Sequence, residues 1–344
     1  TVEKSLISIA GYDILGSDGQ DGLRYAWRYR YGKHLVESAA FPQRSITKQD
    51  NICGYTTSIS SGCALRPIGA QCAFCRTGNV LPFSGPLSYR DIAKQNIFMV
   101  LSDMTCEDHP ELHKRAREFA YMGQGEPGLS YTQVRLAIEL TNQAMHSLGQ
   151  TVHRHIFATS GVPESIEALK DDIKNYYTQR VTLHFSLHAT EGRELLMPVE
   201  KHWSYLESLY AMKDMYNLTG EKPCVGILLF NRFQPNSKRF SYSNKFDGIK
   251  KILAELDPQK YRLSFCTYNA ADDICSCEPY PSDVADAVLS YAQEQGFDAK
   301  LFSSYGQEKQ TACGTLGGKT ADHEPSEKWI ALEKEVEVLI QNLI

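Results

Sequence analysis

The sequence lacks any apolar run long enough to cross a membrane. Nowhere in its 344 residues does a stretch approach the roughly 18 apolar residues that a membrane helix needs. Residues 1–11 also lack the basic segment, apolar stretch and cleavage site of an export signal. These absences predict a cytoplasmic protein with no membrane partner. An apolar share of 42% is enough for a substantial core.

An excess of positive charge is missing as well, since the formal net charge is −5 at pH 7. Affinity for nucleic acid rests on clustered Lys and Arg that displace counterions, so this balance disfavours a large phosphate-binding surface. Internal repeats and low-complexity runs are absent too, which excludes a solenoid. Composition leaves the oligomeric state unknown.

Cysteine, by contrast, is plentiful, with ten in the chain. Without an export signal, a disulfide framework is a poor explanation for so many thiols. We therefore interpret them as metal ligands, catalytic thiols and core residues in a reducing compartment.

Alternating patterns predict an α/β fold. Residues 24–40 alternate on both sides of a Tyr31-Gly32-Lys33 turn, which predicts a β-hairpin in front of the main domain. After residue 75, short strand-like runs alternate with longer amphipathic stretches, as in repeated β/α units with a parallel sheet. The expected strands are 119–122, 153–158, 181–187, 224–230, 262–267 and 299–303, and the expected helices are 89–101, 131–148, 164–177, 203–216, 245–256, 283–295 and a terminal helix in 326–344.

Cys63, Cys72 and Cys75 form a C-x8-C-x2-C pattern. An iron–sulfur cluster normally takes four thiolates, so three would leave one iron open to a chelating amino acid such as the methionine part of S-adenosylmethionine. A reduced cluster could then cleave the sulfonium and generate a 5′-deoxyadenosyl radical. Zinc sites use similar cysteine pairs, and a zinc-binding interaction protein remains an alternative at this point.

The cysteine segment resembles the cluster loop of the RlmN/Cfr family of radical methyl synthases, which modify adenosine in RNA. The matching stretches are S-I-S-S-G-C-A-L at 58–65 and C-A-F-C-R-T-G at 72–78, with a five-residue insertion relative to the family's C-x3-C-x2-C. Four more segments follow in the family's order: Y-M-G-Q-G-E-P at 121–127, T-S-G-V-P at 159–163, F-S-L-H-A at 185–189 and T-A-C-G-T-L-G-G at 311–318.

The resemblance implies a partial (β/α)6 radical S-adenosylmethionine barrel. We expect an amino-terminal extension with the hairpin at 1–50, the barrel at 51–325 and a carboxyl-terminal helix at 326–344. The implied cofactors are a 4Fe-4S cluster on Cys63, Cys72 and Cys75, and S-adenosylmethionine. Glu126 would receive the methionine ammonium and Phe74 would pack on adenine. The other implied cofactor contacts are Gly125, whose missing Cβ permits close approach, Ser160, Ser186 and Asn269.

Two cysteines carry the implied methyl transfer. Cys313 matches the family's carrier, which is methylated, loses hydrogen to the 5′-deoxyadenosyl radical and adds the resulting carbon radical to an sp2 carbon. The family's second cysteine, which resolves the covalent adduct, corresponds by count to Thr56 here. We therefore consider Cys53, three residues earlier, as the substitute.

The substrate expectation departs from the family. The chain has room only for the hairpin where the family carries a helical RNA-binding domain, and its net charge is negative. A radical methyltransferase acting on a small molecule or peptide is therefore expected ahead of one acting on RNA. RNA methylation, through basic residues of 232–251 and 24–33, is one alternative, and radical chemistry without methyl transfer is another. Each enzyme needs an external electron donor such as flavodoxin or ferredoxin.

Overall fold

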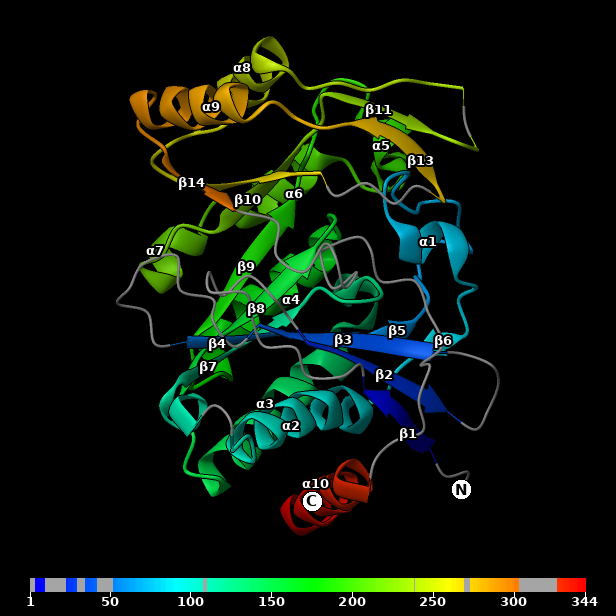
Figure 1. Ribbon diagram of the computed structural model, residues 1–344. Helices are drawn as coiled ribbons and strands as arrows, with labels where there is room; N and C mark the ends of the chain where they lie inside the picture. Colours follow the sequence, from blue (N-terminus) through cyan, green and yellow to red (C-terminus); the bar gives the residue numbers. More distant parts are fainter. Residues whose placement is uncertain are drawn as a thin grey trace.

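A ten-stranded sheet organises the chain in the computed structural model, which describes residues 4–9, 23–29, 35–41, 52–107, 110–237, 239–268, 273–302 and 327–344. The strand order is β1-β2-β3-β4-β7-β8-β9-β10-β12-β14 (Figure 1). Their bounds are β1 Lys4–Ile9, β2 Leu23–Tyr29, β3 Leu35–Phe41, β4 Ile52–Thr56, β7 Ala116–Tyr121, β8 Val152–Thr159, β9 Val181–Ser186, β10 Cys224–Leu229, β12 Arg262–Thr267 and β14 Asp298–Phe302. Two small ribbons pair β5 Ser60–Ser61 with β6 Gly85–Pro86, and β11 Arg232–Pro235 with β13 Cys275–Glu278.

From β4 onward, neighbouring strands of the large sheet run parallel. At least one helix lies between each of the strands β4, β7, β8, β9, β10 and β12 and the next strand of the large sheet, and β14 adds a final strand. This arrangement confirms the predicted partial (β/α)6 barrel. The sequence pattern did not identify β4, although it is the strand that leads into the cysteine loop.

Helices cover the outer face of the sheet (Figure 1). The longer ones are α2 Tyr89–Met104, α3 Tyr131–Ser147, α4 Pro163–Asn175, α6 Tyr205–Met212, α8 Phe246–Ala254, α9 Ser282–Glu294 and α10 Glu327–Leu343, and the short ones are α1 Arg76–Val80, η1 Pro110–Lys114, η2 Pro127–Ser130, α5 Arg193–Leu196, η3 Pro198–Lys201 and α7 Met215–Thr219. One helix was expected over 203–216, but the structure divides this stretch into α6 and α7 around Asp214, the residue before α7. The terminal helix α10 packs against α2 and α3.

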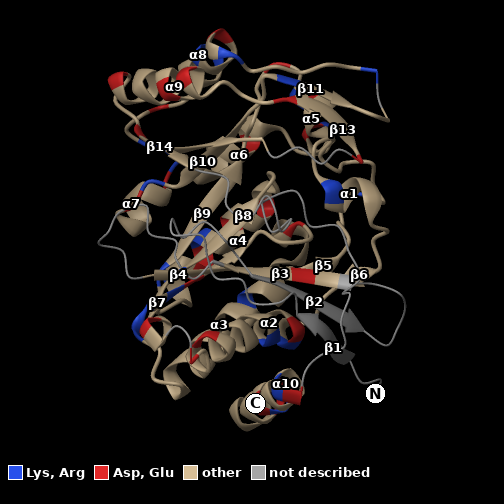
Figure 2. Cartoon of the chain, in the orientation of Figure 1, with Lys and Arg blue, Asp and Glu red and all other residues tan. Residues whose placement is uncertain are grey.

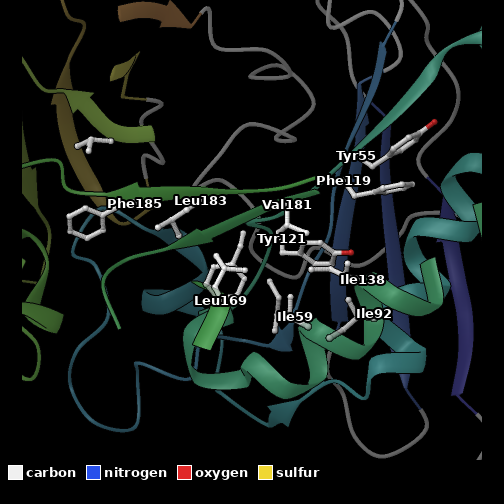
Figure 3. Packing of buried hydrophobic residues seen from close by; sticks show 14 of the residues in the cluster. Tyr55, Ile59, Ile92, Phe119, Tyr121, Ile138, Leu169, Val181, Leu183 and Phe185 are labelled. Atoms are coloured by element: carbon white, nitrogen blue, oxygen red, sulfur yellow. The ribbon is translucent and has the colours of Figure 1, made fainter. Parts of the chain in front are cut away.

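Alternation along the strands separates the two faces of the sheet. In β9, Val181, Leu183 and Phe185 are buried in the main apolar core, whereas Thr182 and Ser186 alternate with them on the inner face. Figure 3 shows these apolar side chains packed between the sheet and the helices. The core therefore holds the strands in register and leaves their inner face and carboxyl ends available for chemistry.

The amino-terminal strands extend this sheet. β2 and β3 pair antiparallel in the stretch where a hairpin was expected, and β3 pairs antiparallel with β4, with Ala39 opposite Thr56. The division of the chain into three parts stays a prediction.

None of the described helices is both long and apolar enough to span a bilayer. Acidic and basic residues are mixed on α8 and α10 (Figure 2).

His155 is fully buried between β8 and the helices. The Tyr121 hydroxyl lies 3.1 Å from Nδ1, and Asn142 Oδ1 lies 3.1 Å from Nε2. Because the other end of the Asn142 amide donates to the Ile138 carbonyl, Oδ1 accepts from Nε2–H. A neutral imidazole therefore satisfies both partners, and burial lowers the pKa of His155 to about 3.

This depressed pKa predicts a loss of stability in mild acid. Below pH 6.5 the unfolded chain binds a proton at His155 that the native protein does not bind until about pH 3. The free energy of unfolding should therefore fall by about 2 kcal/mol between pH 7 and pH 5 on account of this group. Urea unfolding of His155→Gln should show a pH dependence weaker by that amount, and an unchanged pH dependence would contradict the assignment.

Candidate active site

The predicted cluster cysteines lie in the loop after the carboxyl end of β4. Cys63 is buried in a second apolar cluster, against which Cys72 and Cys75 pack. Burial raises the pKa of the Cys63 thiol to about 12, and the Cys75 thiol adds to the shift. Burial also raises the pKa of Cys72, with contributions from Cys75 and Cys63. The three sulfur atoms thus influence one another in one low-dielectric site.

The eight-residue spacer between Cys63 and Cys72 is a folded bend. The Arg66 N–H donates to the Cys63 carbonyl at 3.0 Å, and the Ala70 N–H donates to the Leu65 carbonyl at 2.8 Å. Gly69 closes the bend with a φ of +68°, which favours glycine. The insertion therefore returns the chain to the site through its own hydrogen bonds.

Asn79 organises the Cys72–Cys75 turn. Its Nδ2 donates to the carbonyl of Cys72 at 2.9 Å and to that of Cys75 at 2.7 Å. The Cys75 N–H also donates to the Cys72 carbonyl at 3.3 Å. The sequence analysis missed Asn79, although an amide one helical turn after a cysteine is a recognisable signal.

The chemistry of these residues fits an iron–sulfur cluster. Within the described part of the chain, no group of three or more His, Cys, Asp or Glu side chains is arranged to hold one metal ion. A 4Fe-4S cluster binds each thiolate through a different iron, so its ligands surround a larger body. Three mutually coupled thiols in one apolar cluster suit that requirement, and the positive irons would stabilise the thiolates that burial disfavours.

Glu126 is buried at the carboxyl end of β7. Its Oε1 accepts from the Gly128 N–H at 2.9 Å and the Thr159 hydroxyl at 2.6 Å. Its Oε2 accepts from the Ser160 N–H at 2.9 Å and the Ser160 hydroxyl at 2.6 Å. These four bonds match the acceptor capacity of a carboxylate. An incoming ammonium would therefore have to redirect one of the two hydroxyls.

The glycines before Glu126 lie close to the segment that leads to Cys63. A Cβ on Gly123 would lie 2.6 Å from Ser58 Oγ, and one on Gly125, at φ +108°, would lie 3.1 Å from the Ser60 nitrogen. The missing Cβ atoms thus let this loop pack against the segment that leads to Cys63. The predicted close approach of Gly125 to the cofactor stays a prediction.

Arg193 ties together the ends of two neighbouring strands. It is 1% exposed, and its Nη2 donates to the carbonyls of Ser160 at 2.7 Å and Ser186 at 3.3 Å. Its Nε donates to the Leu187 carbonyl at 3.1 Å, and Glu200 pairs with its charge. The predicted cofactor contacts Ser160 and Ser186 are therefore held together by a buried cation that the sequence analysis missed.

Phe74 lies in an aromatic group beside the cysteines. Its ring centroid is 5.2 Å from that of His188, 5.7 Å from Phe230 and 6.1 Å from Tyr268. His188 stays neutral, because burial lowers its pKa to about 3 and its Nδ1 accepts from the Leu228 N–H at 3.1 Å. The predicted packing of Phe74 on adenine stays a prediction.

The described structure contains one of the two predicted catalytic cysteines, Cys53. Cys53 is fully buried in the main apolar core within β4, away from the cluster of residues that contains Cys63. Burial raises the pKa of Cys53 to about 12, which disfavours a reactive thiolate. Its resolving role stays a prediction. Cys313 and Asn269 lie outside the described residues.

Comparison with known proteins gives consistent matches, although no family model matches the chain. The "Probable dual-specificity RNA methyltransferase RlmN" of Heliobacterium modesticaldum is 26% identical over 307 residues, 88% of this chain and 71% of the relative. Its namesake from Flavobacterium psychrophilum is 25% identical over 320 residues, covering 92% and 82%. A radical SAM methyltransferase structure from Sphaerobacter thermophilus shares the fold, with a TM-score of 0.69, 18% identity and coverage of 92% and 82%.

The names of these relatives contradict one expectation from sequence. A small molecule or peptide was placed ahead of RNA as the substrate, whereas the relatives are named as RNA methyltransferases. The expectation rested in part on the net charge, which averages over the whole surface and says nothing of a local binding region.

Proposed function

We propose that this chain, an RlmN/Cfr-like radical S-adenosylmethionine enzyme, methylates an unactivated carbon of adenosine in RNA. The observation that carries the proposal is the shared site of Cys63, Cys72 and Cys75 at the carboxyl edge of a partial barrel, in a chain similar to RNA methyltransferases. A cytoplasmic location is part of the proposal.

Cys63, Cys72 and Cys75 would hold a 4Fe-4S cluster, with Asn79 fixing the turn between the last two. The cluster and S-adenosylmethionine supply the one-electron chemistry that activates carbon. Glu126 would orient the methionine ammonium once the Thr159 or Ser160 hydroxyl turns away from it.

Arg193 and the aromatic group complete the cofactor site. Arg193 holds Ser160 and Ser186 at adjacent strand ends, where both would contact the cofactor. Phe74 would pack on adenine and, with Phe230 and Tyr268, keep water from the radical.

Cys313 would be the methyl carrier. Its sulfur would take a methyl group from a first S-adenosylmethionine, with S-adenosylhomocysteine leaving. That methyl group would lose one hydrogen atom to a 5′-deoxyadenosyl radical from a second S-adenosylmethionine, and its carbon would then form the new bond to the RNA carbon. An aromatic C–H carbon of this kind is not a nucleophile, so a direct displacement would fail. Cys53 would resolve the adduct, provided that its strand opens enough to release the buried thiol.

RNA must compete with acidic partners for the exposed cations of 232–251. Arg232 lies 3.3 Å from Glu278, and Lys251 lies 2.8 Å from Glu191. Exposed pairs of this kind are weak, so phosphate groups can replace the carboxylates. Binding of RNA should then weaken steeply as salt rises, in proportion to the number of phosphates contacted.

Anaerobic turnover with methyl-deuterated S-adenosylmethionine, a chemical reductant and total RNA tests the proposal. We expect label in adenosine after nuclease digestion, together with 5′-deoxyadenosine, and less label at high salt. Label confined to a small molecule or peptide when extract replaces RNA would overturn the choice of substrate. 5′-Deoxyadenosine without any labelled product would overturn methyl transfer.

A further inference from the structure

Cys275 and Cys277 form a Cys-x-Cys pair that the proposed function does not use. They lie on β13, which pairs antiparallel with β11 so that Cys277 faces Phe233 and Cys275 faces Pro235. Cys275 is buried and Cys277 is partly exposed. Figure 1 places this ribbon beside α1, the helix that begins directly after Cys75.

A chain of hydrogen bonds connects Cys275 to the Cys72–Cys75 turn. The Tyr268 hydroxyl donates to the Phe74 carbonyl at 2.9 Å, and its oxygen lies 3.2 Å from Cys275 Sγ. A phenol has a single proton, and here it points to Phe74. Cys275 therefore donates its S–H to Tyr268, and the bond ends on the peptide group that joins Phe74 to Cys75.

Two further contacts hold the same segments together. Arg76 Nε lies 2.8 Å from Asp273 Oδ2, so the residue after Cys75 is paired with a residue just before β13. The Tyr268 ring also packs on Phe230, at a centroid distance of 4.9 Å, and on Phe233, at 5.5 Å. The phenol is thereby fixed in position, and its hydroxyl can hold the turn.

We propose that Tyr268 is a positioning residue for the cluster and that Cys275 orients its hydroxyl. The hydrogen bond to the Phe74 carbonyl fixes the orientation of the peptide group before Cys75. It thereby also fixes the direction from which the Cys75 thiolate would bind an iron of the cluster. The inference rests on the proposed function only in that these thiolates bind a cluster.

The reduction potential of the cluster and its retention of iron should depend on the hydrogen bond from the Tyr268 hydroxyl to the Phe74 carbonyl. Reduction potentials of iron–sulfur clusters respond to nearby hydrogen bonds and to solvent exposure. Partners that orient a metal ligand affect affinity as well. Without the Tyr268 hydroxyl, the turn can rotate and water can reach the Phe74 carbonyl. Both the retention of iron and the midpoint potential should then change.

Tyr268→Phe tests the proposal, because it keeps the packed ring and removes only the hydroxyl. In the anaerobically reconstituted full chain, we expect iron to pass to a chelator about threefold to tenfold faster than in the wild type, the effect of losing one hydrogen bond. The midpoint potential should shift as well. Cys275→Ala should change the rate of iron loss and the midpoint potential in the same direction as Tyr268→Phe does. Cys275→Ser keeps a hydrogen-bond donor and should give values close to those of the wild type.

Cys277→Ala is the matched control on the same strand and should behave as wild type. Thermal unfolding of the apoproteins separates this role from general stability: Tyr268→Phe should lose iron faster even where its melting temperature is unchanged. Wild-type retention and potential in Tyr268→Phe would overturn the inference. A wild-type protein that binds no cluster would instead overturn the proposed function, so the two failures are distinguishable.

Discussion

Replacing Cys72 with alanine should leave the reconstituted protein almost without iron and sulfide, whereas we expect about four of each in the wild type. Cys72 sits between Cys63 and Cys75 in sequence and is electrostatically coupled to both. Two remaining thiolates cannot hold a cluster against exchange with solvent. Methyl transfer should therefore fall by more than the roughly 100-fold loss that outer partners of metal ligands cause. Iron and sulfide assays, with product analysis, measure both effects.

Cys106→Ala is the appropriate control for this variant. Cys106 is a buried cysteine of the main apolar core, in a different cluster of residues from Cys72. Its variant should keep the full iron content. Retention of the cluster by Cys72→Ala would show that another side chain supplies the third ligand.

Replacing Cys313 with alanine should abolish methyl transfer to RNA and leave the cluster intact. If Cys313 carries the methyl group, the wild-type protein isolated with S-adenosylmethionine should bear one methylated cysteine, and the variant none. The variant should still form 5′-deoxyadenosine, because the cofactor site remains complete. Peptide mass spectrometry and nucleoside analysis of the RNA test both expectations.

Cys277→Ala serves again as a control and should be methylated at Cys313 as in the wild type. Methyl transfer to RNA by Cys313→Ala at a comparable rate would remove the carrier from the mechanism. Loss of iron from Cys313→Ala would instead give this cysteine a structural role at the cluster.

The alternation of strands and helices could be predicted because these elements carry strong periodic patterns, whereas the partial barrel was implied by the resemblance to a family. The run at 262–267 matches β12 at both ends, and 181–187 is one residue longer than β9. β4 was not predicted as a strand because it is only five residues long and contains Gly54 and Thr56 among its apolar residues. Its strand identity comes from pairing with β3 and β7, which a local pattern does not contain.

Motifs located the site but not the contacts that build it. Glu126 belongs to a recognisable segment, yet three of its four hydrogen bonds come from Thr159 and Ser160 at the end of β8. Arg193 and Tyr268 act through backbone carbonyls of other strands and turns, a role that any donor of the right length could fill. Such partners become visible only when tertiary structure brings distant segments together. The substrate expectation failed for a related reason, because total charge carries no spatial information.

We propose that the thiolates of Cys63, Cys72 and Cys75 bind one cluster and leave one iron open to S-adenosylmethionine. Electron paramagnetic resonance of the reduced, reconstituted protein tests it most directly, with spectra recorded before and after addition of the cofactor. We expect the signal of a reduced 4Fe-4S cluster whose g-values change when S-adenosylmethionine binds. A spectrum that does not respond to the cofactor, or a protein that assembles no cluster, would contradict it.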